Sequence, residues 1–149
     1  MSAASTVKIL IGDWAGQGAA AAPLRHAVFV VEQGVPLALE LDEMDPLAEH
    51  AVAWIGEQAV GTARLLPDGH IGRMAVVAAQ RGCGIGAALL HVLIERARLR
   101  GDPAVRLHAQ VQASGFYRRF GFVEEGDVFD DAGIPHVAMR LPLRSGISH

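Results

Sequence analysis

Gln80-Arg81-Gly82-Cys83-Gly84-Ile85-Gly86-Ala87 is a glycine-rich turn between an apolar, strand-like run and a strong helical pattern. Glycine allows a positive φ and a close approach of the backbone to a ligand, and the first amides of the following helix have no acceptor within that helix. These free N–H groups and the positive end of the helix dipole favour an anion such as a pyrophosphate. Three glycines alternating over five residues exceed what a plain connection requires, so the turn predicts an anion-binding site.

The composition limits the class of protein. With 149 residues and one cysteine, we expect a single domain spanning residues 1–149 and no internal disulfide. No apolar run approaches the ~20 residues that cross a bilayer, so we expect a cytoplasmic protein that does not enter a membrane. The formal net charge of −3 argues against a broad nucleic-acid surface, and we expect no nucleic-acid partner.

Before the turn, the sequence predicts a strand at residues 7–11, a helix and a three-stranded meander. Pro23 is expected to begin the helix, which runs to Gly34. Its buried face, at helical spacing, would be formed by Leu24, Ala27, Val28 and Val31. The meander would consist of strands at 50–55, 59–66 and 70–76. Neither face of its middle strand is cleanly polar, which is typical of a sheet covered by helices.

After the turn, a helix is expected to continue to about residue 100, where Gly101 supplies a left-handed cap. Its inward face would be formed by Ile85, Leu89, Val92 and Leu93. The order that follows is a strand at 104–110, a short helix around 116–120, a strand from 122, a turn at 130–133 and a last strand at 136–143.

The segment 37–48 is rich in carboxylates and is expected to form either a short helix or an ordered loop. Its acidic residues are Glu40, Asp42, Glu43 and Asp45. Two interpretations stay open: a solvated acidic loop, or a lip that attracts a cationic substrate.

Two other nucleotide-binding motifs fit the glycines poorly. Gly82, Gly84 and Ala87 satisfy the loose dinucleotide pattern, but that fold needs a βαβ unit and a carboxylate at the end of the next strand. Here a meander comes first, and Asp102 precedes the next strand. A P-loop would need a Gly-Lys-Ser/Thr sequence, which does not follow the turn.

Three motifs in order resemble the GNAT superfamily of acetyl-CoA-dependent N-acetyltransferases. Arg81-x-x-Gly84-x-Gly86 is similar to the pyrophosphate loop of that family. The run Arg73-Met74-Ala75-Val76-Val77 stands where the fourth strand of the family pairs with the pantetheine arm. Phe116-Tyr117-Arg118-Arg119-Phe120-Gly121-Phe122 resembles the Tyr-x-x-x-Gly-Phe segment of the family.

A narrower resemblance is to the ElaA-like and YjcF-like branch of this superfamily. It rests on Val28-Phe29-Val30-Val31-Glu32-Gln33-Gly34-Val35-Pro36, on His108-Ala109-Gln110 and on Gly133-Ile134-Pro135-His136-Val137-Ala138-Met139. Glu40, Asp42, Asp45 and His50 follow the first of these stretches.

The resemblance implies an α/β (α+β) fold with a mixed, mostly antiparallel sheet of about seven strands and about four helices. The sheet would splay between strands 4 and 5. Acetyl-CoA would be the cosubstrate, with no metal, and its pyrophosphate would lie on backbone amides of the glycine turn. The implied cofactor-binding residues are Met74, Ala75, Val76, Arg81, Gly82, Cys83, Gly84, Ile85, Gly86, Ala87, Gln110, Phe116 and Arg119.

For catalysis, the resemblance places Tyr117 as the general acid that protonates the CoA sulfur, and an amide near Met74 to Val76 as an oxyanion donor. Tyr117 could instead be a half-buried aromatic residue with its hydroxyl in solvent. His136 titrates near neutrality and is a candidate base, or else a structural residue at a strand end. Cys83 lies in the phosphate turn, away from the thioester, so we expect direct transfer in a ternary complex instead of an acyl-cysteine.

The acceptor site is expected beside the end of the first helix, where Glu32 and Gln33 are candidate substrate contacts together with Asp42. A solvated helix terminus is the alternative for the first two. His50 and His108 are interpreted as sheet residues. The remaining histidines are interpreted as surface residues: His26, His70, His91 and His149.

The resulting hypothesis is an N-acetyltransferase, an acyltransferase enzyme, that acts on a primary amine of a small molecule or peptide. One alternative is a non-catalytic acyl-CoA-binding sensor or partner module. Another is an acyltransferase that uses a longer acyl-CoA. A homodimer is compatible with the apolar last strand.

Overall fold

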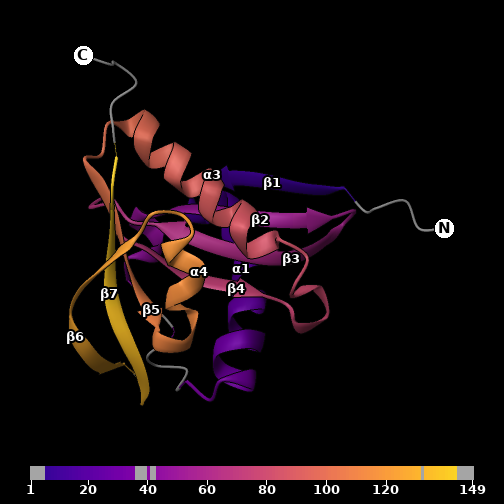
Figure 1. Cartoon of the computed structure of the whole chain (residues 1–149). Helices are drawn as coiled ribbons and strands as arrows, with labels where there is room; N and C mark the ends of the chain where they lie inside the picture. The colour runs from indigo at the N-terminus through magenta and orange to yellow at the C-terminus, as the bar shows by residue number, and fades with distance from the viewer. Residues whose placement is uncertain (1–5, 36–39, 41–42, 132, 144–149) are drawn as a thin grey trace.

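The computed structural model of the chain describes residues 6–35, 40, 43–131 and 133–143. Within them, seven strands form two antiparallel sheets, and three α-helices accompany them (Figure 1). The strands are β1 (Val7–Gly12), β2 (Glu49–Ile55), β3 (Gln58–Leu65), β4 (Ile71–Val76), β5 (Ala104–Gln110), β6 (Val123–Asp131) and β7 (Ile134–Pro142). The helices are α1 (Trp14–Arg25), α3 (Ile85–Arg100) and α4 (Ser114–Arg118), with a π-helix η1 (His26–Glu32) and 3₁₀ turns η2 (Asp45–Leu47), η3 (Ala78–Gln80) and η4 (Val111–Ala113).

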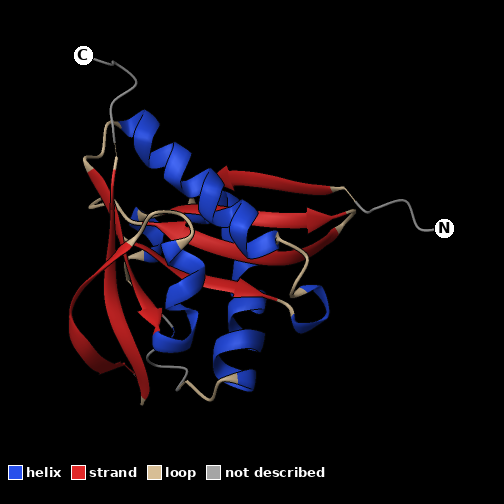
Figure 2. Cartoon of the chain, in the orientation of Figure 1, coloured by secondary structure: helices blue, strands red, loops and turns tan. Residues whose placement is uncertain are grey.

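The two sheets meet at one point and then separate. The first has the order β1-β2-β3-β4, the predicted meander, and the second has the order β5-β7-β6. His70 and Arg106 form a parallel bridge, and the amide of Arg106 donates to the carbonyl of Gly69 at 3.0 Å. Beyond this bridge β4 and β5 diverge, as Figure 2 shows. The predicted split between the fourth and fifth strands is therefore confirmed.

Helices cover both faces of the first sheet, as its sequence predicts. In Figure 1, α3 crosses the near face and α1 lies behind. Ile85, Leu89 and Leu93 of α3 are buried as expected, whereas Val92 is only half-buried. A Cβ on Gly61 of β3 would lie 2.9 Å from Cγ2 of Ile85, so the glycine permits close packing of α3 on the sheet. Gly101 has the predicted left-handed conformation, with φ 84°.

The first helix begins at Trp14, nine residues before the predicted start at Pro23. Asp13 caps it, since its side chain accepts a hydrogen bond from the amide of Gly16 at 2.8 Å. The predicted start left the Gly/Ala-rich stretch after Gly12 outside the helix, but alanine has the highest helix propensity. Pro23 consequently lies inside α1 and does not begin it.

The buried face of this region is only partly the predicted one. Leu24 and Val28 are buried, but Ala27 is exposed and Val31 is 70% exposed. The cause is the π-helix η1, because i→i+5 hydrogen bonding changes which positions share a face. Spacing rules for an α-helix therefore fail after Arg25.

The end of the chain differs slightly from the prediction. β6 extends to Asp131, which pairs with Ile134, so the hairpin turn is shorter than the predicted loop at 130–133, and β7 begins two residues earlier. Of the predicted helix or loop at 37–48, residues 37–39, 41 and 42 lie outside the described part, and the 3₁₀ turn η2 occupies Asp45–Leu47. In the described residues, no helix is long and apolar enough to cross a membrane.

Candidate active site

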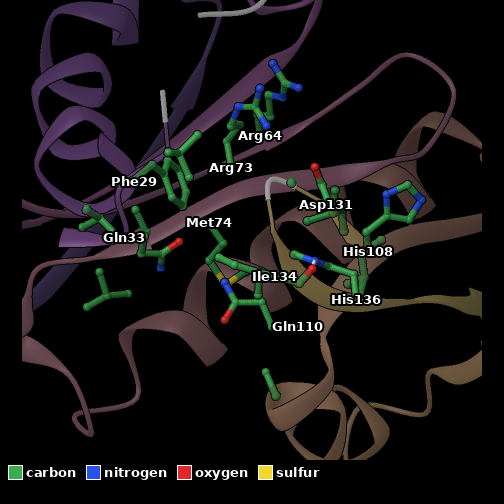
Figure 3. Close-up of a pocket in the computed structure, with 18 of the residues that line it drawn as sticks. Phe29, Gln33, Arg64, Arg73, Met74, His108, Gln110, Asp131, Ile134 and His136 are labelled. Atoms are coloured by element: carbon green, nitrogen blue, oxygen red, sulfur yellow. Dashed lines mark hydrogen bonds between the residues drawn. The ribbon is translucent and has the colours of Figure 1, made fainter. Parts of the chain in front are cut away.

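A cleft of about 730 Å³ opens where β4 and β5 separate (Figure 3). It contains ten of the predicted site residues: Glu32, Gln33, Met74, Ala75, Val76, Arg81, Gln110, Phe116, Tyr117 and His136. Arg119 is exposed and does not line it. Asp42, a predicted substrate contact, lies outside the described residues.

β4 carries a bulge at the point where it faces the cleft. Thr62 pairs with Ala75 and Arg64 pairs with Gly72, so the ladder leaves Arg73 and Met74 opposite a single residue of β3. Arg73 has φ 49°, the one positive value among the described non-glycine residues. A bulge takes backbone groups out of the ladder and turns them elsewhere. The backbone around Met74 thus departs from the regular ladder beside the cleft.

The glycine turn adjoins one end of this cleft. Gly82 and Gly84 have φ values of 81° and 82°, which favour glycine, and a Cβ on either would meet no atom within 4 Å. Gly84 is the N-cap of α3, so the first amides of α3 lack intrahelical acceptors. A Cβ on Gly86 would extend toward Met74 and Phe116, at 3.8 and 4.0 Å. This exposed, glycine-lined cradle fits a diphosphate whose attached chain enters the cleft.

Arg81 and Glu32, predicted to contact cofactor and substrate respectively, contact each other. Both terminal nitrogens of the Arg81 guanidinium donate to the Glu32 carboxylate, at 2.5 and 2.8 Å, and Nε donates to the carbonyl of Val76 at 3.0 Å. The hydrogen bond and charge of Arg81 lower the pKa of Glu32. The pair joins the glycine turn to the end of η1.

Tyr117 and Phe116 lie on the second-sheet side of the cleft, on α4. Their rings are 5.0 Å apart and nearly perpendicular. Burial raises the pKa of Tyr117, so its phenol stays protonated throughout the physiological range. Gln110 ends β5 nearby, and its side-chain oxygen accepts a hydrogen bond from Gln112 at 2.7 Å. Cys83 is exposed in the turn, away from the cleft lining.

The geometry around His136 defines its tautomer. Its Nδ1 lies 2.7 Å from the carbonyl oxygen of Ile134, which can only accept, so Nδ1 carries the proton. In the neutral ring Nε2 is then the proton acceptor. The ring stacks on Phe129 with centroids 6.1 Å apart. This arrangement is compatible with a base and with a structural residue.

Two carboxylates of the acidic segment are buried, so neither a solvated loop nor an open lip describes them. Glu40 and Asp45 are 5% and 4% exposed, and both bind Arg25, through Nε at 2.5 Å and a terminal nitrogen at 2.7 Å. Asp45 also accepts from Arg64 at 2.9 Å. Burial would raise the pKa of Asp45, but the two arginines outweigh it and lower that pKa. These carboxylates are therefore neutralised by buried cations, which corrects both sequence interpretations for them.

His50 belongs to the same network. It is 1% exposed, and its Nε2 donates to the carbonyl of Asp45 at 2.9 Å, which confirms its interpretation as a sheet residue. Burial lowers the pKa of His50. Trp14 covers the network, with its ring 5.4 Å from the guanidinium carbon of Arg25 and 4.8 Å from the ring of His50.

Several cleft residues were not predicted from the sequence. His70 was interpreted as a surface residue, but it lines the cleft together with His108. Arg64 and Arg73 line the wall formed by the first sheet, as Figure 3 shows. An arginine within an otherwise apolar strand was the one available signal for Arg64. Within the described part of the chain, no three His, Cys, Asp or Glu side chains are grouped to hold a metal ion.

Comparison with known sequences identifies relatives of the same branch as the resemblance. YjcF, an uncharacterized N-acetyltransferase of Bacillus subtilis (strain 168), is 38% identical over 120 residues, which cover 78% of this chain and 86% of YjcF. The protein ElaA of Escherichia coli (strain K12) is 35% identical over 124 residues, which cover 78% of this chain and 81% of ElaA.

Solved structures have the same fold. The crystal structure of Escherichia coli ElaA superposes with a TM-score of 0.82 at 31% identity, covering 89% of this chain and 98% of ElaA. The crystal structure of an acyl-CoA N-acyltransferase from Pseudomonas aeruginosa superposes with a TM-score of 0.82 at 34% identity, covering 91% of this chain and 99% of that protein. The family model for the acetyltransferase (GNAT) domain matches residues 12–143. With its split sheet and glycine turn, this chain belongs to the GNAT family of acetyltransferases.

Proposed function

We propose that this transferase moves an acetyl group from acetyl-CoA to a primary amine, by direct transfer in a ternary complex. The observation that carries the proposal is the cleft between β4 and β5, which joins an exposed glycine cradle at one end to Tyr117 and His136 within it. Acetyl-CoA supplies an activated acyl group as its thioester.

Binding of the donor would depend mainly on backbone groups. Amides from Arg81 to Ala87 are available for the diphosphate, because the turn and the first turn of α3 leave them without helical acceptors. The free edge of β4, at Met74 to Val76, offers N–H and C=O groups to the pantetheine amides, as a strand edge does. Gln110 and Phe116 lie on the facing wall.

Three groups of the cleft meet the chemical needs of the transfer. An amide at the β4 bulge around Met74 would donate to the thioester oxygen as negative charge develops on it. Tyr117 would protonate the departing sulfur, since its raised pKa keeps the phenol in the acid form. His136 would take a proton from the amine nitrogen through Nε2 as the C–N bond forms.

Thiol release tests this function directly. The protein is mixed with acetyl-CoA or octanoyl-CoA and a panel of primary amines and peptides, and free CoA is measured with a thiol reagent. We expect amine-dependent release with acetyl-CoA. Tight CoA binding without release for any amine would favour the acyl-CoA sensor, and release with octanoyl-CoA alone would favour a longer acyl donor.

A further inference from the structure

Two of the three histidines in the cleft have no role in the transfer as described so far. His70 lies at the bridge where β4 and β5 meet, and His108 lies on β5. Both line the cleft, and Figure 3 shows His108 beside His136 and Asp131. Their contacts with one another connect the cleft to an exposed carboxylate at its edge.

Asp68 binds His70 in two ways. Its Oδ1 accepts from the backbone amide of His70 at 3.1 Å and lies 3.0 Å from Nδ1 of the ring. Nδ1 therefore carries a proton, and Nε2 is the position that can gain or lose one. Burial would raise the pKa of Asp68, but the hydrogen bonds from His70 outweigh it and lower that pKa. Asp68 is thus ionised at neutral pH and holds the His70 ring through Nδ1.

The turn that carries Asp68 and His70 is fixed against β5. Gly69 has φ 92°, and a Cβ on it would lie 2.7 Å from the carbonyl oxygen of Ala104. The carbonyl of Gly69 accepts from the amide of Arg106, and the carbonyl of His70 accepts from the amide of Leu66 at 2.7 Å. Only glycine permits this approach, which places His70 at the base of the cleft.

His108 lies between two rings. Its centroid is 6.0 Å from that of His70 and 5.0 Å from that of Phe129, with its ring nearly perpendicular to both. His108 remains exposed to the cleft, but desolvation by its neighbours lowers its pKa, and positive charge on His70 and His136 lowers it further, against the opposing charge of Asp131. His108 is therefore neutral, and able to accept a proton, at neutral pH.

We propose that His108, His70 and Asp68 form the route by which the acceptor amine loses its first proton to solvent. The inference rests on the proposed acetyl transfer. His108 takes the proton that makes the bound ammonium a neutral nucleophile, and the electron pair stays on nitrogen. The proton passes to Nε2 of His70 across a distance that one water spans, and then to solvent, while Asp68 positions His70. The second amine proton, taken by His136, balances the proton that Tyr117 gives to the sulfur.

Buffer dependence distinguishes a proton route from a structural role. With acetyl-CoA and the best amine, kcat is measured for H108Q, H70A and D68N, and for H91Q on the exposed face of α3 as control. We expect kcat to fall about 10- to 100-fold in H108Q and about 3- to 10-fold in H70A and D68N. Added imidazole buffer should restore kcat in H70A and D68N, with KM for acetyl-CoA unchanged. H91Q should match the wild type.

A titration that needs no turnover gives a second readout. NMR of the imidazole protons should show the His108 titration at higher pH in H70Q than in the wild type, because a neighbouring positive charge is removed. Wild-type kcat in H70A and D68N, or a loss that imidazole never restores, overturns the route. An inactive wild type refutes the proposed function, whereas a shifted titration would still support the coupling of His108 to His70.

Discussion

Arg81 of the glycine turn holds both carboxylate oxygens of Glu32, at 2.5 and 2.8 Å, across 49 residues of sequence. Its Nε is bonded to the carbonyl of Val76 at the end of β4. Three elements that border the cleft, the turn, β4 and η1, therefore meet at one guanidinium. Three of its five N–H donors are thereby engaged and its charge is neutralised by Glu32, so Arg81 can offer its full charge and both terminal nitrogens to a diphosphate only when Glu32 releases it.

Replacing Glu32 tests this competition. In Glu32→Gln we expect CoA to bind about 2- to 5-fold more tightly, because a negative charge is removed and the guanidinium becomes available to phosphate oxygens. Isothermal titration with CoA at two salt concentrations measures the effect, which should shrink at higher salt. Glu57→Gln, in the exposed β2–β3 turn, is the control. Weaker CoA binding in Glu32→Gln would show instead that the pair pre-organises the turn.

The backbone conformation of the glycine turn can be tested with a matched pair. Gly84 and Gly126 have φ values of 82° and 80°, and a Cβ on either meets no atom within 4 Å. Alanine at each should cost about 1–2 kcal/mol of unfolding free energy through backbone strain alone. Only Gly84→Ala should weaken CoA binding, by at least about 10-fold, because only this residue shapes the cradle. Equal CoA affinities in the two variants would exclude the cradle as the diphosphate site.

Tyr117→Phe should lower kcat by about 100-fold or more while leaving CoA affinity within about 2-fold. The hydroxyl is the only group lost, and the packing of the ring against Phe116 and Phe122 is retained. Since burial raises the pKa of Tyr117 above the ordinary phenol value of about 10, the phenol should cause no basic fall in kcat up to pH 10. Steady-state rates from pH 6 to pH 10 measure this, and unchanged kcat would remove Tyr117 from the mechanism.

The buried ion network, formed by Arg25, Glu40, Asp45 and Arg64, should contribute strongly to stability. Asp45→Asn leaves Arg25 and Arg64 buried without their shared carboxylate, and we expect a loss of about 3–5 kcal/mol in the free energy of unfolding. Glu43→Gln, an exposed position in the same segment, should change it by less than about 0.5 kcal/mol. Urea denaturation followed by circular dichroism compares the two. Similar urea midpoints for the two variants would mean that water replaces the Asp45 carboxylate as the partner of the arginines at little cost in free energy.

The free energy of unfolding should fall as the pH drops below neutrality, and protonation of His50 should cause the first part of this decrease. Burial lowers its pKa in the folded protein, so below about pH 6.5 the unfolded chain binds a proton that the folded chain resists. The stability that His50 contributes above that pH is lost as the pH falls toward the lowered pKa of His50 in the folded protein. Asp45, also lowered, acts in the same direction only below about pH 4.

Urea unfolding of the wild type and His50→Gln at pH 7, 6 and 5 tests this. The variant should be less stable at pH 7, because a buried ring is lost, but its stability should depend less on pH. An equal pH dependence in the two proteins would assign the effect to other groups.

Most of the fold was predictable because its signals are local. Strand alternation, the turn residues between β2, β3 and β4, and the cap at Gly101 depend on a few neighbouring residues. The prediction failed at α1 and η1, where alanine propensity and a π-helical geometry outweighed the expected start at Pro23 and the α-helical spacing to Val31.

The sequence by itself determined the order of the strands in the meander, the glycine turn and the GNAT family, because motif spacing and periodicity are written along the chain. Tertiary structure alone decided which charges are paired. Asp45 is neutralised by Arg25 and Arg64, which come from separate elements, and Glu32 is held by Arg81. It also decided that His70 and His108 meet, since only the split between β4 and β5 brings them together. Burial and ion pairing arise from folding, so residue type cannot reveal them.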